Sequence, residues 1–288
     1  MKKSKLTPWL LLAPFLAVTV LVIISVWNVL AQSLGLLPAF GLTEPTVEYY
    51  RQVLSDETFL SSLAVSLKIA LWSAVLATAL GVLVCAALVS CRKGGIVHVV
   101  RLPILVPHTV VALFVITICS QTGLIARAGA ALGLIADSTE FPQLLFSENY
   151  VGVILAYLWK EIPFLAYFVL ALMSGVSSTL GEAAENLGAS PLKSFFQITL
   201  PLSLPAITKA FLIIFIFAFG GYELPLLLGA TLPKALSVTT YLAYMSPDLL
   251  QRPLAMAMNG TMLLLSAAMS LLYALAIIGL NRKIGGAK

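Results

Sequence analysis

Three ionisable side chains lie inside otherwise apolar stretches, where their chemistry calls for an explanation. Lys160 and Glu161 interrupt the stretch Val151–Met173, and Glu223 interrupts the stretch Ile207–Leu228. A charged group at the centre of a bilayer costs about 2.5–3.5 kcal/mol on insertion scales, so it usually faces a cavity or a partner. One hypothesis is therefore that Glu223 and Glu161 line a path through a membrane and offer negative charge to a cationic solute.

Each of these charges also has a purely structural explanation. Neutralisation by Lys160 would account for Glu161, but adjacent residues point about 100° apart on a helix and share no face closely. A partner on a neighbouring helix is the second structural explanation for Glu161, and a structural role is the preferred interpretation of Lys160. Near the outer interface Glu223 would reach water, so a path-lining role and an interfacial role both stay open for it.

The surroundings of Glu223 make it the first candidate for the path. The run Gly220-Gly221-Tyr222-Glu223-Leu224-Pro225 predicts an interrupted helix. Glycine and proline free backbone groups that must then be satisfied by protein or by water in a cavity. Glu223, Tyr222 and Glu161 are accordingly the candidate residues of the substrate path.

Patterns typical of catalysis, metal binding and nucleotide binding are missing from the sequence. It has no Gly-x-x-x-x-Gly-Lys-Ser/Thr phosphate loop, no Ser/His/Asp set and no cysteine spacing typical of metal ligands. His98 and His108 show no partner in the sequence and are interpreted as structural. We predict that the chain is not an enzyme and holds no cofactor or metal.

Composition places these residues in a membrane protein. Of 288 residues, 60% are hydrophobic and 10% are charged, against about a quarter charged in soluble domains. A helix needs about 20 apolar residues to cross the hydrocarbon, and the sequence has six such stretches: Pro8–Ala31, Leu63–Val89, Leu102–Cys119, Val151–Met173, Ile207–Leu228 and Leu254–Leu280. The prediction is an all-α integral membrane protein with one transmembrane domain, residues 1–288.

The distribution of charge predicts the orientation of these stretches. A net charge of +5 would suggest a nucleic-acid partner for a soluble protein, but here none is expected, because basic residues report topology. Lysine and arginine gather at both termini and in the second and fourth connections, whereas the first and third connections are acidic. An even number of crossings therefore predicts that both termini are cytoplasmic.

Residues 175–205 form the most informative connection, because they are too polar to cross a membrane. Thr179 and Glu182 have the spacing of a capping box that starts one helix, and Gly188 supplies a left-handed end. Ser190 followed by proline predicts a second helix, with Leu192, Phe195 and Phe196 on one face and an end at Pro201 and Pro205. An amphipathic linker lying on lipid headgroups is the alternative interpretation.

The same connection resembles a known motif. Glu182-Ala183-Ala184, Gly188, Ile198, Leu200 and Pro201 match every fixed position of the EAA motif of binding-protein-dependent ABC importer permeases. The resemblance extends more loosely over most of the chain, and the matches outside this loop look closest to the polyamine, ferric-iron and thiamine branch. It implies a type I ABC importer-like permease whose loop docks into a groove on an ATPase subunit.

The resemblance also implies partners and a location. They are a second permease subunit, two ATPase subunits that bind ATP and Mg²⁺, and an extracytoplasmic solute-binding protein, with the chain in the prokaryotic cytoplasmic membrane among its lipids. Intramembrane acids favour a small cationic or polar substrate such as a polyamine, while iron, thiamine, a phosphonate or a sugar stay open. The main alternative is an ion-coupled secondary transporter; an ABC exporter half and a membrane scaffold come after it.

Overall fold

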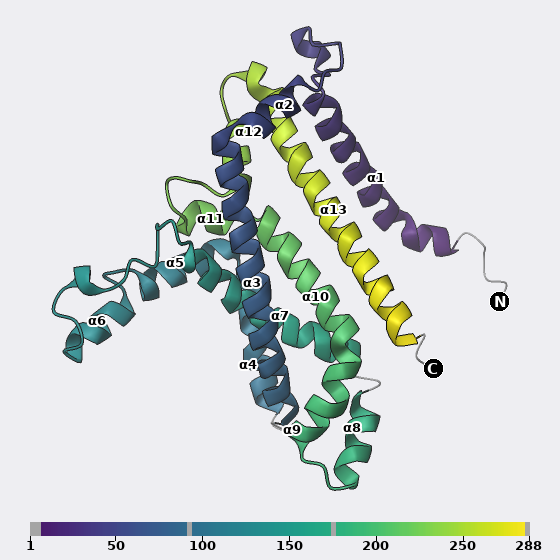
Figure 1. The fold of residues 1–288 in the computed structure, drawn as a ribbon, viewed down its shortest axis with the longest axis vertical. Helices are drawn as coiled ribbons and strands as arrows, with labels where there is room; N and C mark the ends of the chain where they lie inside the picture. The colour runs from purple at the N-terminus through teal and green to yellow at the C-terminus, as the bar shows by residue number, and fades with distance from the viewer. Residues whose placement is uncertain (1–6, 91–93, 174–176, 286–288) are drawn as a thin grey trace. The chain divides into compact units, whose positions relative to one another are not determined.

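The structure is a computed structural model that describes residues 7–90, 94–173 and 177–285. Helices make up its regular structure, and the described residues contain no β-strand (Figure 1). Six helical segments are long and apolar enough to cross a membrane: Trp9–Ser33, Glu57–Leu88, His108–Ala131, Val151–Leu172, Pro191–Gly220 and Leu249–Gly279. The predicted number of crossings and the all-α class are confirmed.

Two of the predicted crossing segments are divided by breaks in the helix. The stretch Leu102–Cys119 is not one helix, because α4 (Gly94–Leu105) ends before Pro107 and α5 (His108–Cys119) begins after it. Proline has no N–H to donate and disfavours a helical conformation in the residue before it. The stretch Ile207–Leu228 is likewise divided, into α10 (Leu200–Gly220) and α11 (Glu223–Leu228).

The described chain falls into two compact units. Residues 1–60 and 240–275 form the first, and residues 61–239 and 276–288 form the second. The helices α3 (Glu57–Ser90), α12 (Leu236–Tyr244) and α13 (Arg252–Gly285) have residues in both. The single transmembrane domain stays a prediction.

The first unit contains α1 (Thr7–Ser33), η1 (Pro38–Phe40), α2 (Glu48–Ser55), η4 (Leu249–Gln251) and most of α13. Tyr50 joins its helices, since its hydroxyl lies 2.8 Å from the hydroxyl of Ser33 at the end of α1. On α13, Gly260 lies against the same Tyr50 hydroxyl, with no room for a Cβ. Small size at Gly260 thus permits α13 to approach α2 closely.

The second unit contains the candidate site. Its remaining elements are α6 (Leu124–Ala131), η2 (Ser138–Glu140), α7 (Val151–Met173), α8 (Ser177–Asn186), α9 (Pro191–Ser194) and η3 (Phe195–Thr199), in addition to α4, α5, α10 and α11. Among its helix pairs α7 makes extensive contacts with both α4 and α10. The ionisable residues Lys160, Glu161 and Glu223 therefore lie in the helical bundle around α7.

Small residues on α3 allow close packing in this unit. Ala70, Ala74 and Ala77 are fully buried, and a Cβ on Gly81 would meet the side chain of Leu165 on α7. In lipid, where the hydrophobic effect does not drive helix association, such residues let backbones approach and gain dispersion energy. The loop to α12 is fixed to the same helix, because the Leu236 N–H donates to the Ser66 hydroxyl at 2.8 Å.

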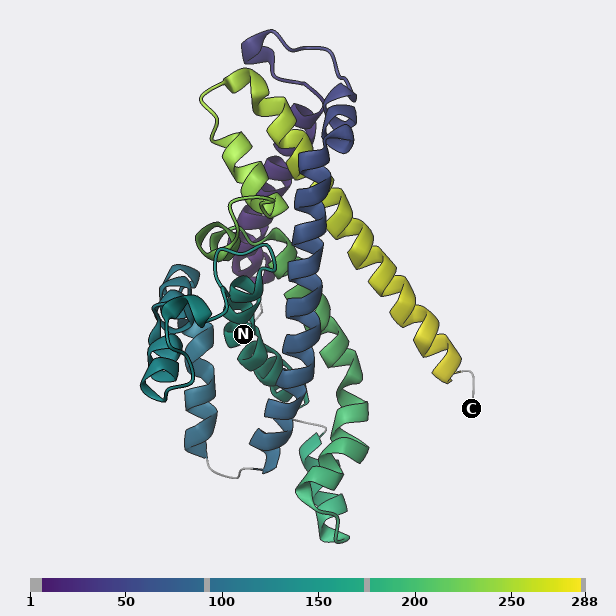
Figure 2. The ribbon, with the colours of Figure 1, turned by 60° about the vertical axis from the view of Figure 1, so that its left-hand side comes forward.

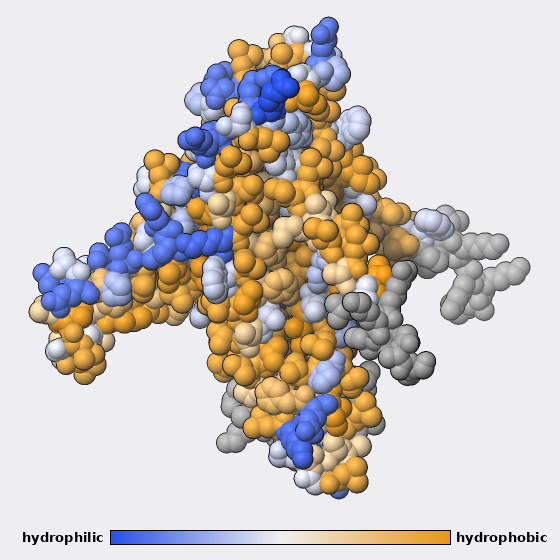
Figure 3. All heavy atoms as spheres, viewed as in Figure 1, coloured by the Kyte–Doolittle hydropathy of each residue, from blue (hydrophilic) through white to orange (hydrophobic). Residues whose placement is uncertain are grey.

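The helices of the second unit differ in how hydrophobic their surfaces are. Hydrophobic residues cover the sides of α3 and α10, and at the tip formed by α8 and α9 a small hydrophilic group lies among hydrophobic residues (Figure 3). Figures 1 and 2 both show α8 and α9 beside each other at the N-terminal end of α10. This tip contains the described part of the 175–205 connection.

Candidate functional site

The first arm of the tip is α8, which ends in a left-handed turn. Gly188 has φ +94°, and its N–H donates to Glu185 O at 2.9 Å while the Ala189 N–H donates to Ala184 O at 3.0 Å. These two bonds make a Schellman motif, which satisfies carbonyls that a helix end would leave free. The predicted left-handed end at Gly188 is confirmed.

The start of this arm differs from the prediction. The helix begins by Ser177, so Thr179 lies inside its first turn and does not cap it. The predicted capping box is therefore wrong in register. Residues 175 and 176, with which the predicted segment begins, lie outside the described residues, as do the side chains of Thr179 and Glu182.

The second arm begins as predicted and continues further. The Ser190 hydroxyl accepts the Lys193 N–H at 3.3 Å, with Pro191 in the first turn of α9. Beyond α9 the chain runs without a break through the π-helical turn η3 into α10, so Pro201 and Pro205 do not end the helix. The Leu200 N–H donates to Phe195 O, five residues back, and this wider turn precedes Pro201 near the start of α10.

The two arms pack together as a hairpin, which we call the α8–η3 hairpin (residues 177–199). Phe195 is buried, and the Ser194 hydroxyl lies 3.4 Å from Gly181 O on α8. Leu192 and Phe196 are exposed, so of the three apolar residues predicted to share one face only Phe195 is buried. The π-helical turn changes the angular spacing that the prediction assumed.

The motif residues divide between the surface of the hairpin and its junction with α10. Ala183, Gly188 and Pro201 are exposed, while Ala184, Ile198 and Leu200 are partly buried. Beside Gly188, at the turn, Leu187 is 90% exposed. Leu180, Leu192 and Phe196 are exposed on the same hairpin, and several exposed apolar side chains on one short element are a feature expected of an interaction surface.

A second group of candidate residues lies where α4 gives way to α5. The Lys160 ammonium on α7 donates to Val106 O at 2.6 Å and is 9% exposed. Because Pro107 follows Val106 and the α4 helix has ended, this carbonyl has no regular helical donor. Lys160 thus caps a broken helix with a buried positive charge, and Glu161 is not its hydrogen-bonding partner at this contact.

The break between α10 and α11 is held in a comparable way. The Gly221 carbonyl, freed at the end of α10, accepts the Ser237 hydroxyl at 2.8 Å. Gly221 also packs against the Tyr157 hydroxyl, with no space for a Cβ between them. The interrupted helix that the sequence predicts around Glu223 is present, and its free carbonyl is satisfied by protein.

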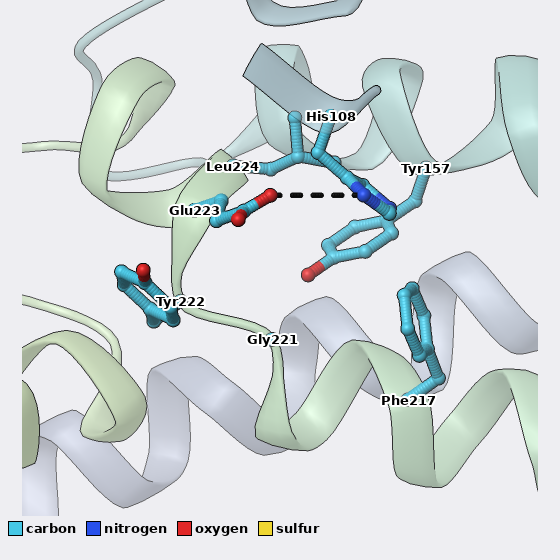
Figure 4. Close-up of a pocket in the computed structure, with 7 residues that line it drawn as sticks. All are labelled: His108, Tyr157, Phe217, Gly221, Tyr222, Glu223 and Leu224. Carbon is cyan, nitrogen blue, oxygen red and sulfur yellow. Dashed lines mark ion pairs between the residues drawn. The ribbon is translucent and has the colours of Figure 1, made fainter. Parts of the chain in front are cut away.

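The break places Glu223 beside His108, a residue that sequence reasoning interpreted as structural and without a partner. His108 Nδ1 lies 3.7 Å from Glu223 Oε2, and both face a cavity of about 220 Å³ that is also lined by Tyr157, Phe217 and Tyr222 (Figure 4). The two residues are 115 positions apart (223 − 108), so no local pattern pairs them. The position of His108 directly after Pro107 was the one available signal.

The other candidate acid lies in an adjoining cavity. Glu161, which is 7% exposed, lines a space of about 200 Å³ with Ile104, His108, Lys160, Phe164, Ile213 and Phe217. His108 and Phe217 line both cavities. Glu161 and Glu223 therefore line two cavities that have two residues in common. Tyr222 lies apart from the Tyr157 and Phe217 rings (Figure 4).

The residues that line the two cavities are suited to binding a charged or polar solute. Within the described ranges, no cluster of three or more His, Cys, Asp or Glu side chains suitable for a metal ion is found. The residues that line the two cavities offer carboxylate oxygens, imidazole nitrogens and ring faces. Glu161 is buried, whereas the side chain of Glu223 is 44% exposed and can be reached by a solute.

Comparison with known proteins places this arrangement in a family. Residues 77–282 match the family described as "Binding-protein-dependent transport system inner membrane component". The match covers more than half of the chain and includes the hairpin and both cavities. The chain belongs to this family, and it is a multi-pass permease component of a binding-protein-dependent ABC importer.

The individual relatives are named for different substrates. The chain is 30% identical over 287 residues to the sn-glycerol-3-phosphate transport system permease protein UgpA of Yersinia pestis, covering 95% of this chain and 91% of UgpA. It is also 30% identical over 180 residues to the putrescine transport system permease protein PotI of Escherichia coli K12, covering 59% of this chain and 56% of PotI, little more than half its length. The sulfate permease CysT of Synechocystis is 25% identical and covers 92% of this chain and 86% of CysT.

Solved structures share the fold. A bacterial ABC transporter involved in the import of alginate superposes with a TM-score of 0.73 at 21% identity, covering 96% of both chains. A second structure, in complex with an alginate pentasaccharide-bound periplasmic protein, gives a TM-score of 0.72 at 19% identity, covering 96% of this chain and 95% of that one. The likeness confirms the expected permease architecture.

Proposed function

We propose that this chain forms half of the translocation path of an ATP-driven importer and takes its energy from a separate ATPase docked on the α8–η3 hairpin. The docking residues are Glu182, Ala183, Ala184, Gly188, Ile198, Leu200 and Pro201. The hairpin then lies in the cytoplasm with both termini. The observation that carries the proposal is a rigid turn with an exposed apolar tip, in which Gly188 and Ser190 fix the backbone and Leu187 is presented outward.

Rigidity matters because the hairpin must transmit movement in both directions. Its first arm packs on η3, and η3 runs without a break into α10, whose far end adjoins Glu223. A displacement of the hairpin is thereby passed along one continuous helix to the cavity. An interfacial linker would need neither the Schellman turn nor this continuity.

The remaining partners follow from the family. One permease chain with one coupling hairpin calls for a second permease subunit, identical or homologous, and for two ATPase subunits that bind ATP and Mg²⁺. A structural neighbour is described with a periplasmic protein bound, which supports a solute-binding protein as the extracytoplasmic partner. The assembly belongs in a prokaryotic cytoplasmic membrane.

The substrate we infer is a small cationic or polar solute such as a polyamine. The candidate path residues are Glu223, Glu161 and Tyr222. The cavity at Glu223 has a carboxylate and no lysine in its lining, which favours positive charge, whereas Lys160 offsets Glu161 in the second cavity. PotI is named for putrescine, whereas UgpA and CysT are named for anions. The cationic assignment therefore depends on the acids of this chain.

Co-purification tests the docking hairpin. The full chain is co-expressed with candidate ATPase subunits and isolated in detergent as wild type, Glu182→Arg and Gly188→Pro. Wild type should retain the ATPase, and both variants should lose it while keeping a monodisperse elution and a cooperative thermal transition. Proline cannot adopt the φ of +94° at position 188.

Glu57→Arg, at an exposed position in the first turn of α3, is the matched charge-reversal control and should retain the ATPase. Retention of the ATPase by both hairpin variants would show that the hairpin is not the docking element.

A further inference from the structure

Three aromatic rings lie to one side of the Glu223 carboxylate (Figure 4). His108, Tyr157 and Phe217 come from α5, α7 and α10, and each lines the 220 Å³ cavity with Glu223. The His108 and Phe217 ring centroids are 5.4 Å apart, and Tyr157 meets Phe217 edge to face at 6.3 Å. The three rings pack against one another and form one side of the cavity, which we call the aromatic wall (Figure 4). Because they come from three helices, tertiary packing sets their position relative to the carboxylate.

The polar atoms of this cavity have unused hydrogen-bonding capacity. The 3.7 Å separation between His108 Nδ1 and Glu223 Oε2 is too long for a hydrogen bond. His108 Nε2 is buried and has no hydrogen-bond partner in the described part of the chain. Nε2 has almost no accessible surface, so a ligand in the cavity meets the imidazole at Nδ1, the nitrogen that faces Glu223.

Aromatic faces and a carboxylate together select one class of ligand. An ammonium group has three N–H donors for carboxylate or imidazole acceptors, and its charge is attracted by ring faces. An anion would meet the carboxylate and the negative ring faces. A hard metal cation prefers six or more oxygen ligands, which this wall does not supply.

We propose that Glu223, His108, Tyr157 and Phe217 form a binding station for the ammonium group of an organic cation. The station deepens the proposed function, on which it rests, by naming the ligand class and by adding His108, Tyr157 and Phe217 to the path. Glu223 binds the charge, His108 accepts a further N–H bond, and the rings cover the alkyl portion.

A second cavity adjoins the station and differs from it in charge. It shares His108 and Phe217 with the first, and Glu161 lies in it. The Lys160 ammonium lines the same cavity and donates to Val106 O, so its positive charge offsets that of the neighbouring Glu161. The first cavity has Glu223 and no lysine among its lining residues, and it is therefore the one that favours a cation.

Ligand-dependent thermal unfolding of the purified full-length chain tests the station. The probes are butylammonium chloride, potassium chloride and potassium sulfate at matched ionic strength. Butylammonium should raise the unfolding midpoint with saturation in the millimolar range, beyond any effect of the potassium salts. Glu223→Gln should remove the saturable part, and Phe217→Leu, which keeps an apolar side chain without a ring face, should weaken apparent affinity about 2- to 5-fold.

Glu44→Gln, an exposed acid in the first unit, is the matched control and should bind as wild type. If Glu223→Gln gives no cooperative transition, Phe217→Leu decides the outcome. Equal shifts with butylammonium and potassium, or unchanged binding by Phe217→Leu, would overturn the station. ATPase co-purification is read independently, so failure here leaves the docking role of the hairpin standing.

Discussion

Two regions of the second unit are stabilised differently. They are the α8–η3 hairpin and the His108 cluster, which consists of His108, Lys160, Glu161 and Glu223. In the hairpin, Gly188 bonds to Glu185 and Ser190 bonds to Lys193, each three residues away along the chain. In the cluster, Lys160 bonds to Val106, 54 residues away, and His108 faces Glu223 from another helix. The hairpin can therefore form locally, whereas the cluster exists only after several helices have packed.

This difference separates the consequences of substitution. A change in the hairpin should weaken ATPase docking and leave the membrane bundle intact. A change in the His108 cluster should lower the stability of the bundle or the rate of solute uptake. The predictions below test that separation, beginning with the largest effect.

Lys160→Met should destabilise the folded chain by about 3 kcal/mol, because Val106 O and the buried Glu161 both lose a positive neighbour. Thermal or chemical unfolding in detergent measures the loss. Lys193→Met, which removes an exposed lysine from the hairpin, should stay within about 0.5 kcal/mol of wild type. Equal effects at the two positions would remove the distinction between the regions.

Glu223→Gln should lower solute uptake about thirtyfold, equivalent to about 2 kcal/mol, while ATPase association is retained. The amide keeps the size of the side chain and loses the charge that attracts a cation. Uptake by the reconstituted transporter with its binding protein is the measurement, and Glu44→Gln is the control. Normal uptake by Glu223→Gln would exclude Glu223 from the path.

Gly188→Ala should weaken ATPase binding by about 1–2 kcal/mol, since an L-residue with a Cβ is strained at a left-handed φ. Titration of the detergent-purified permease with its ATPase gives the affinity. Gly279→Ala, where no atom lies within 4 Å of the added Cβ and φ is not positive, should have no effect. The bundle's unfolding midpoint should be the same in both variants.

Ser190→Ala should have the smallest effect, about 1 kcal/mol on the same affinity, through loss of the cap on α9. Ser25→Ala removes a hydroxyl that bonds only within exposed helix α1 and serves as its control. A Ser190→Ala variant that also lowered uptake beyond its loss of affinity would indicate a role for Ser190 other than capping.

Local residue chemistry in the sequence was sufficient to predict much of the hairpin. The φ requirement at Gly188 and the Ser190-Pro191 start of α9 were predicted, because each depends on neighbours in the chain. The end at Pro201 was wrong, since a π-helical turn carries the helix past it. Pro201 lies in the first turn of α10, where the missing N–H costs least, and the wider turn before it accommodates the ring.

By itself the sequence determined the all-α class, the number of crossings and the break at Gly220-Gly221, because apolar length and backbone freedom are properties of short segments. Only the tertiary structure decided that Lys160 caps Val106 and that His108 faces Glu223. Both pairings join segments that are distant in the chain, and the packing of helices on α7 decides which side chains face each other. The sequence shows that a buried charge needs a partner, but only the fold shows which residue that partner is.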